Sequence, residues 1–186
     1  LAWDIGLRRV AWRIMPPPER RAPKTRDRIH DLVVAPDGGR LAVVDDRGIV
    51  RSLDARTGSV AASYEGRSPM LAAAYSPDGN VIAAGDQEGR IHILDAETAR
   101  LLQIIPGDDC DLRSLAFSPD GRTLAAAGLG RVVRLWDPFT GEELLSLAGH
   151  EAQINSLGFS PDGETLASAD HSGIVRFWRA PRLAAR

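Results

Sequence analysis

One turn motif constrains this chain more than any other feature, because it returns at a fixed spacing. Ser-Pro-Asp-Gly occurs three times and Ala-Pro-Asp-Gly occurs once. The prolines of the four copies are Pro36, Pro77, Pro119 and Pro161, so successive copies are 41, 42 and 42 residues apart. A period of about 40 residues is typical of stacked supersecondary units. The sequence therefore predicts one structural unit made four times, since four copies of one phrase are not four active sites of a small enzyme.

Each motif has the chemistry of a β-turn between two short apolar runs. A serine hydroxyl at the first position can bond the backbone further on, proline presets φ at the second, and glycine suits the end of the turn. In the second copy the apolar runs are residues 71–75 and 81–84. Runs of this length joined by a tight turn predict a β-hairpin.

The second half of each unit is equally regular. A further apolar segment begins ten residues after each turn glycine, at Gly48, Gly89, Arg131 and Gly173. A second turn ("DARTG", "DAETA" or "DPFTG") and a fourth apolar segment follow in the first three units. Many strands carry apolar residues on both faces, as in sheets that are covered on both sides. Four-stranded antiparallel sheets packed around an axis form a β-propeller, so an all-β fold of about four such blades is predicted.

These units resemble the repeats of the WD-repeat (WD40) family, in the form with SPDG turns that is known from bacterial proteins. The copy most similar to the family pattern runs from Gly149-His150 through the turn at 160–163 to Trp178. The resemblance implies a buried hydrogen-bonded network of a His, a Ser or Thr, an Asp and the Trp. By position, His150, Ser168 and Trp178 match three members, and Ser172 stands at the position assigned to the Asp. Apolar packing is then expected to hold the other blades.

The repeat divides the chain into a series of segments. Residues 1–15 look like the end of a preceding blade or a closing strand, and residues 16–28 form a basic, proline-rich loop. The blades are expected at 29–65, 66–106, 107–148 and, without a fourth strand, 149–179, with a tail at 180–186. Three arrangements follow from these incomplete ends: a self-closed ring of four, two chains paired into a ring of eight, or part of a larger ring. The last is favoured, because WD-repeat blades are shaped for rings nearer seven.

Composition excludes several classes of protein. The net charge is −2, so the chain lacks the overall basic character that would indicate nucleic-acid binding. The single cysteine, Cys110, excludes an internal disulfide and fits a reducing compartment, for which we expect the cytoplasm. No apolar run approaches the ~20 residues that a membrane span needs.

No catalytic or metal constellation emerges from the motifs. Two histidines and a carboxylate (His150, Asp170 and His171) have the residue types of a zinc site, but His150 fits a structural position of the family pattern. The acidic stretch 107–111 lacks the ligand spacing of a calcium loop. We therefore expect no catalytic residue, no metal and no cofactor.

The resemblance implies that partners bind where the loops after the fourth strands and between the second and third strands emerge. These loops carry mixed charge, which suits a polar protein or peptide. The candidate partner-binding residues are Arg20, Arg21, Arg67, Asp108, Asp109 and Glu151. The segment 16–28 has no aromatic residue to stack on bases, which disfavours nucleic acid. The expected function is a non-catalytic protein–protein interaction scaffold. The alternative is a sensor or docking region of a larger bacterial signalling enzyme such as a protein kinase.

Overall fold

A computed structural model describes residues 28–107 and 110–179, which form fifteen β-strands in four antiparallel sheets. The first sheet contains β1 (Ile29–Val34), β2 (Arg40–Asp45), β3 (Ile49–Asp54) and β4 (Val60–Glu65). The second contains β5 (Met70–Tyr75), β6 (Val81–Asp86), β7 (Ile91–Asp95) and β8 (Leu101–Ile105). The third contains β9 (Leu112–Phe117), β10 (Leu124–Gly128), β11 (Val133–Trp136) and β12 (Glu143–Leu147). The last contains β13 (Ile154–Phe159), β14 (Thr165–Asp170) and β15 (Val175–Arg179).

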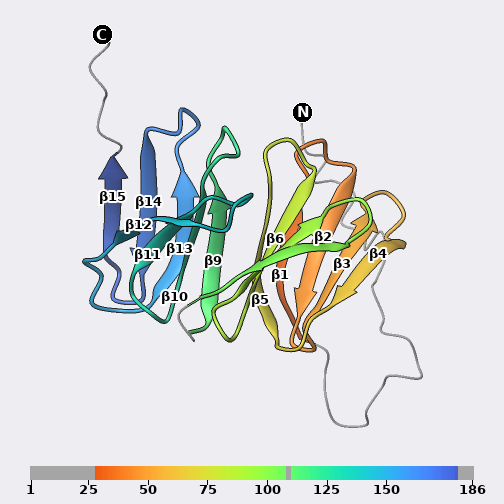
Figure 1. Ribbon diagram of the computed structural model, residues 1–186, viewed down its shortest axis with the longest axis horizontal. Helices are drawn as coiled ribbons and strands as arrows, with labels where there is room; N and C mark the ends of the chain where they lie inside the picture. The colour runs from red at the N-terminus through yellow and green to blue at the C-terminus, as the bar shows by residue number, and fades with distance from the viewer. Residues whose placement is uncertain (1–27, 108–109, 180–186) are drawn as a thin grey trace, which may run out of the picture.

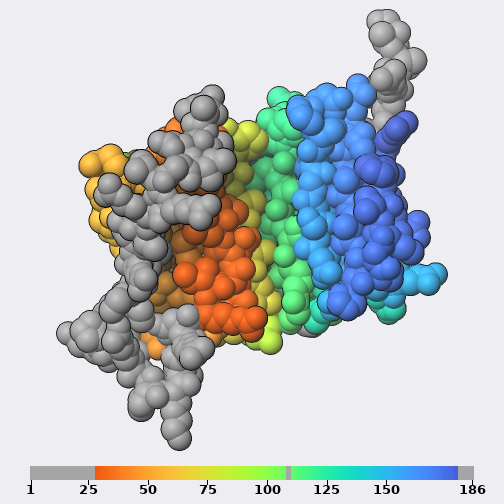
Figure 2. All heavy atoms as spheres, turned by 180° about the vertical axis from the view of Figure 1, so that it is seen from behind, coloured from red at the N-terminus to blue at the C-terminus, as the bar shows by residue number. Residues whose placement is uncertain are grey.

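The four sheets follow one another in chain order across the molecule (Figure 1). The first strand of each sheet contacts the first strand of the next, so β1, β5, β9 and β13 lie on one side of the row. From behind, the colours also change in chain order from the first sheet at one end to the last at the other (Figure 2). These sheets have the arrangement of propeller blades, which confirms the predicted fold class. The described blades form an open arc and not a closed ring of four.

The repeated turn has the geometry that its residues predict. In the second blade, the backbone N–H of Gly79 donates to the carbonyl of Ser76 (N···O 2.9 Å), and Gly79 has φ of +75°. The Ser76 hydroxyl donates to the carboxylate of Asp78 and accepts from the N–H of Val81 at 3.0 Å. A left-handed residue at this place suits glycine, because it has no Cβ. The turn therefore starts β6 directly opposite β5.

The motif also joins neighbouring blades. A Cβ placed on the turn glycine of one blade would lie in van der Waals contact with the proline Cδ of the preceding blade's turn. The three pairs and their distances are Pro36–Gly79 at 3.6 Å, Pro77–Gly121 at 3.5 Å and Pro119–Gly163 at 3.5 Å. Each turn proline thus lies against the bare backbone of the next turn, so the motif serves packing between blades as well as chain reversal.

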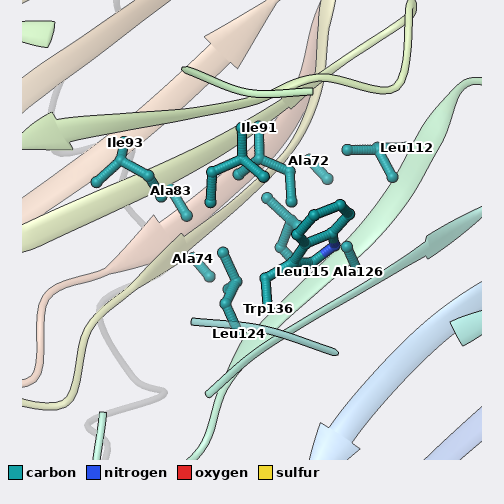
Figure 3. Packing of buried hydrophobic residues seen from close by; sticks show 11 residues of the cluster. Ala72, Ala74, Ala83, Ile91, Ile93, Leu112, Leu115, Leu124, Ala126 and Trp136 are labelled. Carbon is teal, nitrogen blue, oxygen red and sulfur yellow. The ribbon is translucent and has the colours of Figure 1, made fainter. Parts of the chain in front are cut away.

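Apolar side chains fill the space between consecutive sheets. Figure 3 shows the cluster between the second and third sheets, where Ile91 from β7, Leu112 and Leu115 from β9, Leu124 from β10 and Trp136 from β11 meet. Alanines on the facing strands let the two sheets approach closely. Two similar clusters join the first sheet to the second and the third to the last. One core is therefore repeated at each junction.

The outward face of the last sheet lacks such a cover among the described residues. Val50, Ile91 and Val133 hold one equivalent position in the first three sheets, and each is at most 1% exposed. Val175 holds this position in the last sheet and is 54% exposed, and Phe177 on the same strand is 68% exposed. The last sheet therefore presents an apolar face of the kind that its predecessors bury against the next sheet.

The expectations for residues 1–27 and 180–186 lie outside the described residues. Residues 28–107 and 110–179 contain no helix, and so none that is long and apolar enough to cross a membrane.

Candidate partner-binding face

Two sets of loops meet at one end of the blades. In each blade, a residue of the loop between the second and third strands donates its backbone N–H to the carbonyl of the residue directly before the first strand. The four hydrogen bonds are Asp46 to Arg28 (3.1 Å), Gln87 to Pro69 (2.9 Å), Leu129 to Asp111 (3.1 Å) and His171 to Gln153 (2.9 Å). We call the surface formed by these two sets of loops the loop face.

A β-bulge occurs near the start of the first strand in every blade. On β1, Ile29 pairs with Asp45 and Asp31 pairs with Val44, so His30 is the extra residue. The same register shift makes Leu71 on β5, Arg113 on β9 and Asn155 on β13 the extra residues. A bulge leaves its extra residue outside the ladder and can redirect its side chain.

These four bulge residues line one hollow on the loop face. The hollow has a volume of about 510 Å³, and its other lining residues are Arg28, Pro69, Gln87 and Asp111. Because the four positions are equivalent, the repeat builds a rim in which the backbone is constant and the side chain varies between imidazole, isobutyl, guanidinium and amide. Arg113 Nη2 lies 3.3 Å from Asp111 Oδ2, so this guanidinium forms an ion pair with a carboxylate that lines the same hollow. The rim is polar and carries both signs of charge.

Buried aspartates hold the loops between the second and third strands from below. Asp45, Asp86 and Asp170 are the last residues of β2, β6 and β14, and each is at most 6% exposed. In each case Oδ1 accepts two backbone N–H groups of the following turn, at 2.9 to 3.1 Å. A buried carboxylate that accepts several hydrogen bonds is strongly fixed, so these loops are rigid supports for the face.

The second carboxylate oxygen of each aspartate has a different partner in each blade. Asp45 Oδ2 accepts from Arg51 Nη1 at 2.6 Å. Asp86 Oδ2 accepts from Arg90 Nε at 2.8 Å and His92 Nε2 at 3.0 Å. In the first, second and last blades the aspartate is thus the constant part of the network and its cationic or imidazole partner is the variable part.

The last blade contains a four-residue hydrogen-bonded network. Trp178 Nε1 donates to Ser168 Oγ at 2.8 Å, Ser168 Oγ lies 2.6 Å from His150 Nε2, and His150 Nδ1 lies 2.6 Å from Asp170 Oδ2. The assignment of Ser172 to the carboxylate position was wrong: Asp170 holds it, and Ser172 donates to Asp170 Oδ1 at 2.6 Å. Hydrogen bonds from Ser172 and His150 hold the pKa of Asp170 well below its usual range.

A different network joins the first two blades. Tyr64 on β4 donates its hydroxyl to His92 Nδ1 on β7 at 3.0 Å, and His92 Nε2 donates to Asp86. Burial by itself raises the pKa of Asp86, but the hydrogen bonds from His92 and Arg90 outweigh it, and the pKa is lowered. The expectation that apolar packing alone holds the other blades was therefore wrong for the first two. These blades contain the buried aspartate with its arginine or histidine partner, although they lack the Ser and the Trp of the network.

Comparison with known protein families agrees with this geometry. Residues 58–95, 99–137 and 141–179 each match the WD40 family, described as WD domain, G-beta repeat, and the matches cover more than half of the chain. The chain belongs to the WD-repeat family. Each WD-repeat match begins near the fourth strand of one blade and ends with the third strand of the next. None of the curated proteins compared with the chain matches it. WD repeats generally mediate protein–protein interactions and are typically non-catalytic.

The third WD-repeat blade departs from the aspartate rule. Gly128 stands where the other blades have the aspartate, and a Cβ on it would lie 1.9 Å from the carbonyl oxygen of Asp111. Arg131 has φ of +58° at the position that Gly48, Gly89 and Gly173 hold in the other blades. This loop therefore forms without the carboxylate that accepts backbone N–H groups in the other three blades, and it holds an arginine in the left-handed region where they have glycine.

The structure describes two of the six predicted partner-binding residues. Arg67 and Glu151 are exposed at equivalent positions of the loops before β5 and β13, and the Glu151 carbonyl accepts from Arg131 Nη1 at 3.3 Å. The other four, Arg20, Arg21, Asp108 and Asp109, lie outside the described residues. Sequence reasoning missed the bulge residues, although each lies six residues before a motif proline.

The histidine in the network of the last WD-repeat blade serves structure. Both ring nitrogens of His150 are engaged by Ser168 and Asp170, so neither offers a lone pair for a zinc ion. Within 28–107 and 110–179, no three His, Cys, Asp or Glu side chains gather in a way that could hold a metal ion.

Proposed function

We propose that this chain acts as a non-catalytic scaffold that binds a polar protein or peptide segment at the hollow of the loop face. One observation carries the proposal: a bulge at the same place in all four blades makes four different side chains line a single hollow. An equivalent backbone position that reaches the surface and varies in chemistry suits recognition, because the fold does not depend on the identity of its side chain.

The electrostatics of the hollow support a polar partner. Arg28, His30 and Arg113 supply donors, and Asp111 supplies an acceptor, around the hydrophobic contact offered by Leu71. An interface of this kind joins a small apolar contact to a polar rim. In three blades a buried aspartate holds the loop beside the rim, which limits the movement of that loop and so lowers the conformational entropy lost on binding.

Charge reversal at the rim tests the proposal. The double substitution His30→Glu and Arg113→Glu changes two exposed bulge residues and leaves the core intact. The matched control is Arg122→Glu, an exposed arginine in the turn at the other end of β9 and β10. We expect a partner captured by the unchanged chain and by the control to be lost with the double variant. Recovery of the same proteins with all three, each folded by circular dichroism, would contradict the assignment of the loop face.

The basic segment 16–28 extends this proposal. Together with the exposed Arg67, its arginines Arg20 and Arg21 favour an acidic partner or an acidic part of the same partner. Replacing all three with Glu is expected to weaken capture of an acidic partner without changing the fold. Undiminished capture would count against a role for this segment and would leave the role of the bulge residues standing.

A further inference from the structure

A second hollow lies at the opposite end of the blades from the loop face. In an antiparallel meander, the turns between first and second strands and between third and fourth strands emerge at the same end. Between the second and third sheets these turns enclose a groove of about 330 Å³. Its lining includes three prolines and two phenylalanines, Pro77, Pro119, Pro138, Phe117 and Phe139. This groove is rich in rings, whereas the loop face is polar.

Phe139 contributes an exposed ring that the fold does not require. It lies in the turn between β11 and β12, where Asp137 accepts the N–H groups of Phe139 and Thr140 at 2.8 and 3.0 Å. The equivalent turns of the first two blades have Arg56 and Glu97 at this position. The same turn therefore forms with a charged side chain. Phe139 nevertheless stays 69% exposed, which leaves apolar surface in water.

The equivalent groove between the first and second sheets provides an internal comparison. It has a volume of about 380 Å³ and keeps an aromatic ring, Tyr75, where the other groove has Phe117, but Arg40 and Glu97 stand in place of Val81 and Phe139. Arg40 Nη1 donates to the Glu97 carbonyl at 3.2 Å across this groove. The repeat thus builds a groove at the first two junctions, and side-chain changes make the second one more apolar. The exposed ring of Phe139 in the groove between the second and third sheets is therefore not imposed by the fold.

Two carboxylates flank the rings. Asp78 and Asp120 belong to the turns of the second and third blades, line the same groove, and are exposed. Hydrogen bonds from the Ser76 and Ser118 hydroxyls hold the pKa of both below its usual range, so both are ionised at neutral pH. The groove therefore offers negative charge beside aromatic and proline rings.

We propose that this groove binds an extended, proline-rich segment of a partner protein that carries an arginine or lysine beside its prolines. Proline rings pack well on aromatic rings, and a polyproline II segment has already lost the conformational entropy that other peptides lose on binding. The basic side chain would meet Asp78 or Asp120 and lie over the Phe139 ring. This site is separate from the loop face and takes a different chemistry of partner.

The lining disfavours addition of a β-strand as the mode of binding. The groove is built from turns, and their N–H groups are already used: Gly79 donates to Ser76 and Gly121 donates to Ser118, both at 2.9 Å. No row of unpaired backbone groups is offered by these turns. Recognition must then come from side chains, as it does for polyproline II segments.

Fluorescence anisotropy with defined peptides tests the proposal. The probe is the labelled peptide APPLPPRPPA, and its two comparison peptides replace the arginine with glutamate or the prolines with glycine. We expect saturable binding of the probe to the chain, at least ~10-fold weaker binding of both comparison peptides, and weaker binding as salt rises, since a charge pair contributes.

Variants locate the site. Phe139→Glu introduces the residue type that Glu97 supplies in the second blade's turn, and it is expected to weaken probe binding at least ~10-fold. Asp120→Asn is expected to weaken probe binding several-fold and to reduce its salt dependence. The matched control is Leu144→Glu, an exposed apolar residue on β12 of the same blade, which should leave binding unchanged. Absence of saturable binding at ~1 mM peptide, or equal binding to Phe139→Glu with unchanged thermal unfolding, would overturn the proposal.

Discussion

The hydroxyl group of Tyr64 offers a sharp test of how neighbouring blades are coupled. Tyr64 lies on β4 of the first blade and donates to Nδ1 of His92 on β7 of the second, at 3.0 Å. The rings lie 5.6 Å apart between centroids. His92 is 2% exposed, and its Nε2 is occupied by Asp86. The substitution Tyr64→Phe removes one oxygen atom and retains the ring.

The expected effect follows from leaving a buried acceptor without a donor. Loss of one partner from a buried hydrogen bond costs about 1–3 kcal/mol, because the remaining group has lost water as well as its partner. The free energy of unfolding should fall by that amount in urea titrations followed by circular dichroism. For a chain of this length, each 1 kcal/mol corresponds to about 2–4 °C in Tm.

A double-mutant cycle separates the hydrogen bond from other effects of the hydroxyl. His92→Leu removes the acceptor, so Tyr64→Phe should change the free energy of unfolding by less than ~0.5 kcal/mol in that background. An equal loss in both backgrounds would refute the reasoning, because the hydroxyl would then stabilise the chain through something other than His92.

Three further outcomes are expected. Gly128→Ala should lower the free energy of unfolding by more than ~3 kcal/mol, because its Cβ would lie 1.9 Å from the carbonyl oxygen of Asp111. The control Gly158→Ala, whose Cβ would have no atom within 4 Å, should lower it by less than ~1 kcal/mol. Equal losses of the two variants in urea titrations would contradict this expectation. The pKa of Asp86 is lowered in the folded state, so its contribution to stability is present above the unfolded value of about 3.9 and is lost as pH falls through the folded value. In Asp86→Asn, Tm should therefore depend less steeply on pH below about 4. An unchanged slope would count against this role of Asp86. The chain is expected to self-associate through the face of its last sheet that no other described residue covers, so light scattering behind size exclusion should show a concentration-dependent mass that Phe177→Ser lowers. A monomer at all concentrations would refute this expectation.

The interpretation of the turns from sequence was accurate because a β-turn is a local structure. Proline and glycine act on their own φ angles, and the serine and aspartate bond groups only a few residues away. The apolar runs beside each turn then specify which segments pair. The period, the hairpins and the all-β class follow from interactions between residues that are close in the chain, so they are visible without any knowledge of packing.

The missed features depend on register and on contacts between blades. The sequence pattern led to Ser172 in place of Asp170, because a side-chain network depends on which residue ends the strand. Pairing across the sheet decides where the strand ends. Tyr64 and His92 are 28 residues apart and meet only when two sheets pack. The bulge that brings His30 to the hollow is likewise a property of two paired strands, since an extra residue exists only relative to a partner.

By itself, the sequence determined that this chain consists of repeated four-stranded units, where their turns fall and which family they belong to. Tertiary structure alone decided which buried polar groups meet, which residues rim the loop face and which groove is apolar. The physical reason is the range of the interactions involved. Turns and hairpins are specified by neighbouring residues, whereas a hollow or a network between blades arises from side chains that only the packed sheets bring together.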